Sequence, residues 1–348
     1  MKLSEFAYEL PAASIAQAPL EKRDHSRMLV MDRVTGQSFH HYFYEFPLQL
    51  RAGDVVVVND SQVIPARLTG KKDSGGLIEI LLLSKSRDSG GEEAWDVLLK
   101  PAKRLRIGAR ISFAKDAEGI VVDRLSDKKW RVRFFCPGPF ADFLRNHGRA
   151  PLPPYIKRDK DREDAPYDLD RYQTVYARVP GSVAAPTAGF HFSPAVLADL
   201  RDKGVRVVPV TLHVGYGTFL PITAIDIEDH EMEAEYFEIG GESAEIINGA
   251  SRVVAVGTTA TRVIETVADD KGRLKPASGW TSSYVYPGYR FKRVQALLTN
   301  FHLPKSSLYL LTCAFGGKEQ VESAYRQAIG MGYRFYSYGD CMLITQQG

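Results

Sequence analysis

The fold of this chain is decided by residues 76–135, which read GLIEILLLSKSRDSGGEEAWDVLLKPAKRLRIGARISFAKDAEGIVVDRLSDKKWRVRFF. Short runs rich in apolar and β-branched residues recur here between clusters of Gly, Asp, Ser and Lys: 76–84, 94–100, 109–114, 119–125 and 129–135. No helical period runs through them. Short strands at this spacing are typical of a compact antiparallel β domain.

The sequence on either side of this block has a different pattern. DVVVVND at 54–60 is a short apolar run closed by turn residues, as in a buried strand. After residue 180, predicted helices (193–203, 242–250 and 258–269) alternate with predicted strands (205–214 and 252–257). This alternation favours a mostly parallel, helix-covered sheet or barrel.

We therefore predict an α/β fold in which a large α/β domain, with a mixed or barrel-like sheet, carries an inserted all-β antiparallel domain. Residues 1–69 and 151–348 would form the discontinuous α/β domain, and 70–150 the inserted one. Residues 137–156 are predicted to form a helix followed by a proline-rich return. Residues 157–171 mix five basic with six acidic residues and are predicted to be a solvated loop.

Composition narrows the class of protein. The 348 residues are 44% hydrophobic and 25% charged, as in a globular protein with a substantial core. MKLSEFAYEL lacks the basic start and apolar run of a signal peptide, and no apolar run is long enough for a membrane span. Cys136, Cys313 and Cys341 are too far apart for a CxxC metal site and do not form a disulfide framework, so we expect a reducing cytoplasm.

The net charge of +3 does not by itself indicate a nucleic-acid binder, but basic residues are clustered. KPAKRLRIGAR (100–110) holds five of them, and YVYPGYRFKR (284–293) interleaves them with aromatic rings. Cations beside stacking rings are typical of RNA-binding surfaces. A solvated hairpin turn and half-buried strand tyrosines covered by lysine stems would have the same composition.

Two segments of small residues could approach a ligand closely. In VVAVGTTATR (253–262), a strand passes through a tight turn at Gly257–Thr259 into a helix, whose first amides could bind an anionic group. Arg262 could pair with a carboxylate of a ligand or of the protein. GSVAAPTAGFHF (181–192) is nearly free of large side chains before Phe190, which suits either ligand approach or an ordinary turn before a helix capped by Ser193.

Four histidines lie beside polar or small residues at predicted loops or strand ends: His191, His213, His230 and His302. Imidazole suits proton transfer near neutral pH. No HxH or HExxH spacing occurs, so we expect no catalytic zinc. The segment 230–239 places acids around His230 and also has the pattern of an ordinary charged strand. Without GxSxG, HRD with DFG, Walker A or GxGxxG motifs, the hydrolase, kinase, P-loop and Rossmann classes lose their best support.

Taken together, the motifs of this chain resemble those of a known family. In chain order they are IAQAPLEKRDHSRMLV, VVNDSQVIPARL, GSVAAPTAGFHF, TLHVGYGTF, HEMEAEYFEI, VGTTATR, GWTSSYVYPGY, ALLTNFHLPKSSL and YRFYSYGDCMLI. They closely resemble the signatures of the S-adenosylmethionine:tRNA ribosyltransferase-isomerases of queuosine biosynthesis, and the likeness runs from near Phe6 to Ile344. Glu233 stands where the family pattern has a second histidine, and Phe190 where it has leucine.

The resemblance implies an enzyme that transfers and isomerises the ribosyl part of S-adenosylmethionine, its co-substrate, onto 7-aminomethyl-7-deazaguanine at the tRNA wobble position. Epoxyqueuosine remains on the tRNA, while adenine and methionine leave. The family fold is an α/β domain with an inserted β domain. We expect no metal, no membrane partner, a cytoplasmic location and a monomer. The alternatives are a non-catalytic RNA-binding protein and another nucleoside-using, tRNA-modifying transferase.

Candidate site residues follow from the motifs together with this resemblance. The candidates for acid–base catalysis are His191, His213, His230, Glu235 and His302. The candidates for binding S-adenosylmethionine are Ala185, Pro186, Thr187, Gly189, Gly257, Thr258, Thr259 and Arg262. The candidates for binding tRNA are Tyr286, Tyr289, Arg290, Lys292 and Lys305.

Overall fold

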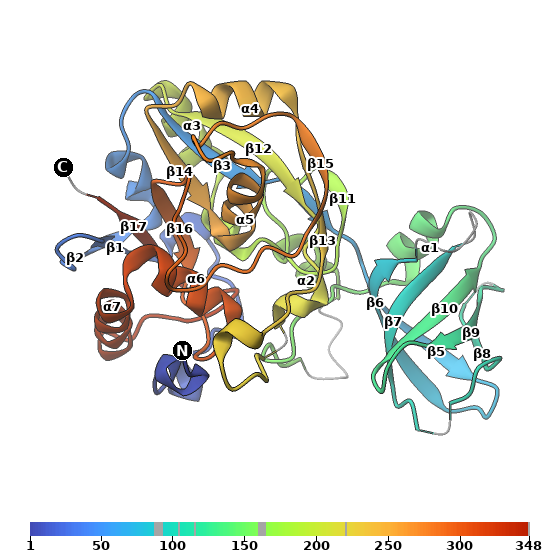
Figure 1. Ribbon diagram of the computed structural model, residues 1–348. Coiled ribbons are helices and arrows are strands. Elements are labelled where there is room, and N and C mark those ends of the chain that lie inside the picture. The colour runs from blue at the N-terminus through green and yellow to red at the C-terminus, as the bar shows by residue number, and fades with distance from the viewer. Residues whose placement is uncertain (87–92, 104, 115, 159–164, 220, 347–348) are drawn as a thin grey trace.

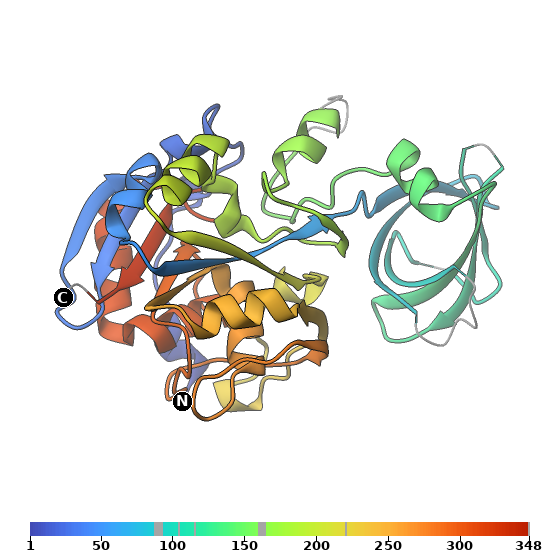
Figure 2. The ribbon, with the colours of Figure 1, turned by 90° about the horizontal axis from the view of Figure 1, so that it is seen from above.

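The computed structural model describes residues 1–86, 93–103, 105–114, 116–158, 165–219 and 221–346. Over these ranges the chain forms two parts, an open sheet covered by helices and a closed β-barrel beside it (Figure 1). Seen from above, extended chain segments lead from the sheet to the barrel and back (Figure 2). The predicted fold class, a large α/β part with an all-β antiparallel part, is confirmed.

Among the described residues, nine strands form the open sheet in the order β15-β13-β12-β3-β14-β16-β17-β1-β2. Their bounds are β1 (Arg27–Asp32), β2 (Ser38–Tyr42), β3 (Asp54–Asn59), β12 (Arg206–Leu212), β13 (Glu235–Ile239), β14 (Arg252–Val256), β15 (Ala277–Thr281), β16 (Ala296–Asn300) and β17 (Cys341–Thr345).

The sheet is mixed, which is one of the two predicted forms, and it is not mostly parallel as the alternation of helices and strands favoured. The central strands β12, β3, β14 and β16 are parallel neighbours, and β17 is parallel to β1. Strands β13, β15 and β2 are antiparallel to their neighbours, as β17 is to β16. The chain returns from β1 to β2 through a short turn, and such a connection gives an antiparallel pair.

The sheet separates two hydrophobic clusters, and β3 contributes to both. Val55 and Val57 face the cluster that contains residues of α4 (Gly241–Asn248), α5 (Gly257–Val267), α6 (Ser307–Gly316) and α7 (Lys318–Gly330). Val56 and Val58 face the cluster with α3 (Pro194–Asp202) and the 3-10 helix η4 (Phe43–Gln49). Burial on both faces explains why β3 reads as a continuous apolar run.

Helix α3 begins as the sequence predicts. The Ser193 side chain accepts a hydrogen bond from the Val196 amide at 3.3 Å, and Pro194 occupies the first helical position. The remaining 3-10 helices are η1 (Leu3–Phe6), η2 (Ala12–Ser14), η3 (Arg23–His25), η5 (Thr187–His191), η6 (Tyr216–Phe219) and η7 (Ile227–Asp229). Across the described ranges, no helix has the length and apolarity needed to cross a membrane.

Six strands of the described chain close into the antiparallel barrel: β5 (Arg67–Lys72), β6 (Leu77–Lys85), β7 (Ala94–Lys100), β8 (Arg110–Ser112), β9 (Glu118–Arg124) and β10 (Lys129–Phe135). Alternate residues face inward, as Trp130, Val132 and Phe134 of β10 show. Helix α1 (Phe140–His147) adds Phe140 and Phe143 to the same core. The barrel thus has its own hydrophobic cluster.

The segments that join barrel and sheet lie side by side. Strand β4 (Ser61–Val63) pairs with β11 (Val179–Ser182), and Arg67 bridges Arg149 where the chain enters and leaves the barrel. The predicted boundary between residues 69 and 70 falls within β5. The division into a 70–150 domain inserted between 1–69 and 151–348 remains a prediction.

The prediction of a solvated loop at 157–171 was wrong for its second half. Residues 165–171 form helix α2 (Ala165–Arg171), and Asp168 is buried against Arg158, with two contacts of 2.8 and 2.9 Å. The charge pattern could not show this, because burial of one ion pair depends on where the segment packs. Residues 159–164 lie outside the described residues.

Candidate functional site

A cavity of about 580 Å³ opens at the edge of the sheet where the parallel strands end. Strand β14 passes directly into α5 at Gly257, and β16 ends at Thr299 and Asn300, all of which line the cavity. Carboxyl ends of neighbouring parallel strands meet at one edge of a sheet, which is the usual ligand site of α/β folds. We call this space the strand-end cavity.

Six of the eight predicted S-adenosylmethionine-binding residues line the strand-end cavity: Ala185, Pro186, Thr187, Gly257, Thr258 and Thr259. They come from the 181–192 segment and from the first turn of α5. These two segments are far apart in sequence, and the sheet brings them together. Lys305 and His302 line the same cavity.

The electrostatic character of this cavity is set by helix ends. Among the described residues that line it, none is acidic. The amino end of α5 at Gly257 and that of α6, beside Ser306, both open into it. Helix amino ends carry partial positive charge and unpaired amides, so the wall favours an anionic group.

The Thr259 hydroxyl supports a ligand at the same place. This side chain is 7% exposed, and its Oγ1 has no hydrogen-bond partner. A buried hydroxyl without a partner carries a desolvation cost that a polar ligand atom would offset. Thr259 therefore suits a role in ligand binding better than one in the core.

Unusual backbone conformations are concentrated in this cavity wall. Among the described residues, Asp116, Lys305 and Tyr336 are the non-glycine residues with positive φ, and the last two, at +60° and +74°, line the cavity. The Asn300 side-chain amide donates to the Tyr336 carbonyl at 3.0 Å and holds that turn in place. Such conformations persist where surrounding contacts impose them, and they are frequent at functional sites.

Two of the predicted catalytic histidines are deeply buried. His302 lines the cavity, and its Nε2 lies 2.7 Å from the Thr299 hydroxyl. His191 lies behind the wall, with Nδ1 2.6 Å from the Ser26 hydroxyl and Nε2 3.4 Å from the Asn300 amide nitrogen. Burial lowers the pKa of each ring to about 3, so both are uncharged at neutral pH.

Acid should therefore destabilise the protein through these two histidines. Their unfolded rings titrate near pKa 6.5, so their stabilising contribution is complete above that pH and is lost as the pH falls toward 3. At pH 5 we expect a loss of about 2 kcal/mol per histidine, measured by denaturant unfolding at pH 7 and pH 5. If His191→Gln and His302→Gln together leave the pH dependence unchanged, this explanation is wrong.

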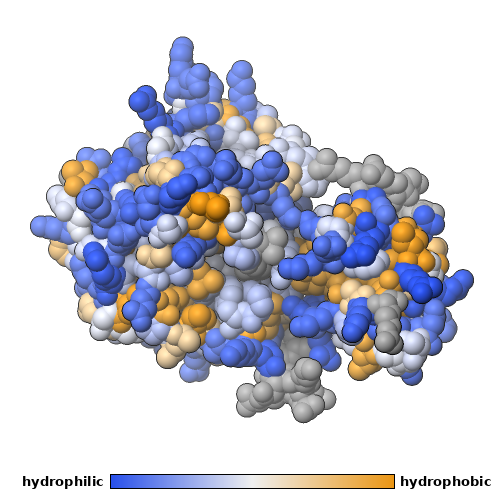
Figure 3. All heavy atoms as spheres, turned by 60° about the horizontal axis from the view of Figure 1, so that its bottom comes forward, coloured by the Kyte–Doolittle hydropathy of each residue, from blue (hydrophilic) through white to orange (hydrophobic). Residues whose placement is uncertain are grey.

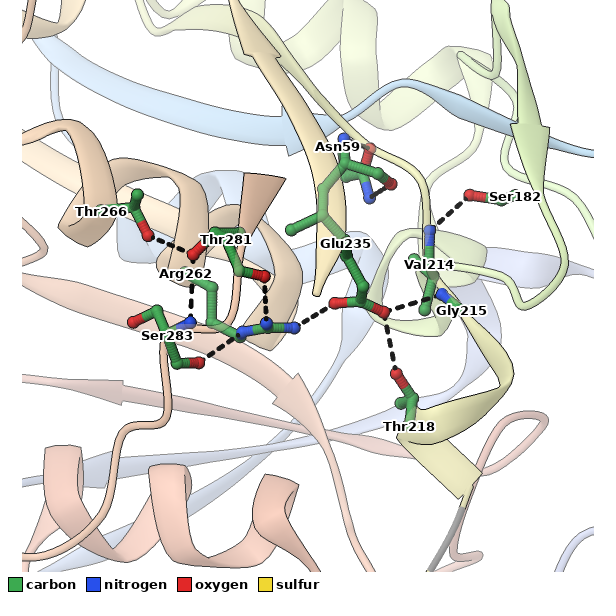
Figure 4. A network of polar contacts seen from close by, with 11 residues as sticks. Asn59, Ser182, Val214, Gly215, Thr218, Glu235, Arg262, Thr266, Thr281 and Ser283 are labelled. Carbon is green, nitrogen blue, oxygen red and sulfur yellow. Dashed lines mark hydrogen bonds and ion pairs between the residues drawn. The ribbon is translucent and has the colours of Figure 1, made fainter. Parts of the chain in front are cut away.

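Glu235 and Arg262 do not line the strand-end cavity but form a buried ion pair behind it (Figure 4). Glu235 accepts from the Gly215 amide at 2.7 Å and from the Thr218 hydroxyl at 3.4 Å. Arg262 donates to carbonyl oxygens of the 281–283 segment. The pair thus fastens α5 to β13 and to the loop that carries Thr218 into the cavity wall.

His213 and His230 lie outside the strand-end cavity. His213 Nδ1 is 2.7 Å from the Ser61 hydroxyl, and its ring stacks on Tyr236 with centroids 5.7 Å apart. The His230 ring lies edge-on to Tyr284 at 5.1 Å. Burial is the largest cause of the lowered pKa of both rings. The structure therefore does not bring the five predicted catalytic groups together around one space.

The small residues of 181–192 serve two different purposes. Ala185 to Ala188 line the cavity, whereas Gly189 packs against Tyr176. A Cβ at Gly189 would lie 2.0 Å from the Tyr176 hydroxyl oxygen, and one at Gly181 would lie 2.6 Å from the His213 ring. Both glycines are thus required by packing as well as by any ligand.

The predicted tRNA-binding residues of 286–292 lie along α5 and away from its amino end. The Tyr289 hydroxyl donates to Glu265 at 3.3 Å, and the Lys292 ammonium donates to the Ala268 carbonyl at 3.0 Å. Tyr286 packs on Tyr284 with centroids 4.9 Å apart, and Arg290 is exposed. None of these residues is among those that line the strand-end cavity in the described structure.

Sequence reasoning did not single out several residues of the cavity wall: Tyr155, Thr218, Thr299, Asn300, Tyr336 and Ser337. Most of them lie within ALLTNFHLPKSSL and YRFYSYGDCMLI, two of the motifs on which the family resemblance rests. Membership of those motifs was the sequence signal that could have identified them as site residues. Within the described ranges, no group of three or more His, Cys, Asp or Glu side chains could hold a metal ion.

The known proteins that match this chain belong to the family that its motifs resemble. A family model described as queuosine biosynthesis protein matches residues 3–344. The S-adenosylmethionine:tRNA ribosyltransferase-isomerase of Syntrophus aciditrophicus is 56% identical over 360 residues, covering 99% of both chains. Its namesake from Natranaerobius thermophilus is 47% identical over 350 residues, again covering 99% of both.

A solved structure shares the fold as well. The crystal structure of S-adenosylmethionine tRNA ribosyltransferase from Thermotoga maritima superposes with a TM-score of 0.54 at 33% identity, covering 98% of this chain and 99% of that one. The family match spans nearly the whole chain and agrees with the motifs and with the strand-end cavity. The chain therefore belongs to the queuosine biosynthesis protein family that contains the S-adenosylmethionine:tRNA ribosyltransferase-isomerases.

Proposed function

We propose that this protein transfers and isomerises the ribosyl part of S-adenosylmethionine onto 7-aminomethyl-7-deazaguanine at the tRNA wobble position. Epoxyqueuosine then remains on the tRNA, and adenine and methionine are released. The observation that carries this assignment to the strand-end cavity is the amino end of α5, where Thr259 presents an unpartnered buried hydroxyl. Family membership supports the reaction.

The residues present fit S-adenosylmethionine. The amides of Gly257–Thr259 and the Thr259 hydroxyl would hold the carboxylate of the methionyl group. The rings of Tyr155 and Tyr336, with centroids 4.1 Å apart, and apolar side chains such as Ile222 offer packing surface for a flat base. A cavity of about 580 Å³ lies within the usual range for such ligands.

The reaction needs groups that move protons. A proton must leave the carbon next to the sulfonium, adenine must depart, the aminomethyl nitrogen must attack, and an epoxide must close as methionine leaves. His302 is the predicted catalytic histidine that lines the cavity, so we propose it as a group that exchanges a proton with the substrate. We propose that His191 positions the Asn300 amide, which in turn holds the Tyr336 turn.

Product analysis tests the function directly. The protein is incubated with S-adenosylmethionine and tRNA carrying 7-aminomethyl-7-deazaguanine, and small molecules and nucleosides are identified by mass spectrometry. Equal amounts of adenine and methionine together with epoxyqueuosine in the tRNA are expected. Release of S-adenosylhomocysteine would instead indicate a methyltransferase, and tRNA binding without any release would indicate a non-catalytic RNA-binding protein.

Thr259→Val should weaken S-adenosylmethionine binding by about tenfold or more, because a hydrogen bond to a charged group contributes about 1.5–3 kcal/mol. The melting temperature should stay nearly unchanged, since the hydroxyl has no partner within the protein. Thr261→Val is the matched control. It is the same substitution in the same helix, but the Thr261 hydroxyl already has a partner within the protein, the Gly257 carbonyl at 3.0 Å. Unfolding of Thr259→Val with intact affinity in the folded fraction would show a structural threonine.

We also propose that the protein acts as a monomer in the cytoplasm. The location rests on its free cysteines, Cys136, Cys313 and Cys341, and on the cytoplasmic setting of tRNA modification. Light scattering coupled to size-exclusion chromatography tests the oligomeric state against the 38.8 kDa chain mass.

A further inference from the structure

A second cavity, of about 790 Å³, lies between the barrel and the segment that returns from it. Its lining includes Leu81, Leu98 and Lys128 of the barrel, Arg149 of the return segment and Tyr216 of the loop after β12. We call it the interlobe cavity. In the view of Figure 3, hydrophilic side chains lie on both sides of the boundary between the two parts.

The lining of the interlobe cavity carries more cations than acids. Its three acids each have a basic partner: Glu79 pairs with Arg67, Asp127 with Arg124 and Asp168 with Arg158. In contrast, three lining cations have no acidic partner within 4 Å among the described residues: Lys100, Lys128 and Arg149.

These three cations come from three separate chain segments. Lys100 ends β7 and Lys128 lies in the turn before β10, whereas Arg149 follows α1 on the return segment. All three are exposed. A polyanion in this cavity would therefore meet positive charges from three separate chain segments, beside apolar surface from Leu81, Leu98 and Tyr216.

The interlobe cavity adjoins the strand-end cavity. Pro154 lines both. The loop after β12 contributes to both as well: Val214 and Thr218 line the strand-end cavity, and Tyr216 lines the interlobe cavity. A chain seated in the interlobe cavity would thus lie next to the place where S-adenosylmethionine is proposed to bind.

We propose that the interlobe cavity binds a single-stranded stretch of the tRNA substrate, the anticodon loop, with its phosphates at Lys100, Lys128 and Arg149. This rests on the proposed function. Phosphates account for the excess of cations, and unpaired bases can pack on the ring of Tyr216 and the neighbouring leucines. A loop strand suits the site because its bases are free of pairing and can leave the strand toward the adjoining cavity.

The test measures equilibrium binding of a fluorescent anticodon stem-loop over a range of salt concentrations. The Lys128→Ala/Arg149→Ala double variant should lose about five- to eightfold in affinity per cation at 0.1 M salt, and the magnitude of the slope of log affinity against log salt should fall by about 0.7–0.9 per cation removed. The KM for S-adenosylmethionine should not change, because neither residue lines the strand-end cavity. Arg201→Ala on α3, an exposed cation outside both cavities, is the matched control.

Wild-type affinity and salt slope in the double variant would overturn the proposal. A loss confined to Arg290→Ala/Lys292→Ala would overturn it as well and place the RNA on the 284–293 segment. These outcomes are distinct from failure of the proposed function, which would appear as wild-type protein that releases no adenine. Melting temperatures equal to that of the wild type confirm that the exposed substitutions leave the fold intact.

Discussion

Glu235→Leu is expected to destabilise the protein by about 3–5 kcal/mol, because it leaves the Arg262 guanidinium buried without its counter-charge. Both side chains are about 5% exposed, so water cannot replace the lost carboxylate. The amide of Gly215 and the hydroxyl of Thr218 lose their acceptor in the same variant. Denaturant unfolding at pH 7 measures the free-energy change.

Two companion variants separate the charge from the packing. Glu235→Gln keeps an oxygen for the Gly215 amide and should cost less than Glu235→Leu. The Glu235→Leu/Arg262→Met double variant removes both charges and should regain much of the lost stability, since apolar replacement of a whole buried pair is often neutral. If the double variant is no more stable than Glu235→Leu, the ion pair is not the source of the effect.

The same pair should influence the reaction through the cavity wall. Because Thr218 lies in that wall and Glu235 fixes its loop, Glu235→Gln should raise the KM for S-adenosylmethionine more than it lowers kcat. A fall in kcat alone, with KM and stability unchanged, would instead support the direct catalytic role that the sequence predicts for Glu235.

Glu265→Ala is expected to cost about 3 kcal/mol or more, because three backbone amides lose one common acceptor. Glu265 is 1% exposed and accepts from the amides of Lys292, Arg293 and Val294 at 2.7, 3.0 and 2.9 Å. An unpaired buried amide costs about 1–3 kcal/mol. Thermal and denaturant unfolding measure the change.

The control is Glu265→Gln, which keeps one of the two acceptor oxygens and should cost less than the alanine variant. Amide hydrogen exchange of residues 292–294 should accelerate in Glu265→Ala relative to that of α6. Stability within about 1 kcal/mol of wild type would contradict the role of Glu265 as the anchor of the 284–293 segment.

Much of the site could be predicted where the signal is local. The strand, glycine and threonine pattern of 253–262 predicted a turn at a helix amino end, and Gly257, with φ of +83°, begins α5 there. By contrast, Glu235 was predicted to be catalytic and Arg262 to bind S-adenosylmethionine. Nothing in the sequence shows that these residues, 27 positions apart, pair with each other. Strands β1 and β2 were not predicted. The burial of Asp168 was not predicted either, because the charged residues around it in the sequence indicated a solvated loop.

The sequence by itself determined the family, the run of barrel strands and the alternation of helices and strands within 193–269, because strand and helix periods, caps and motifs depend on neighbouring residues. Only the tertiary structure decided which polar groups face a common space. The strand-end cavity joins segments near residues 187, 258, 300 and 336, and they meet because β14, β16 and β17 are neighbours in the sheet. Strand order is set by the free energy of burying both faces of that sheet, a property of the whole chain and of no single segment.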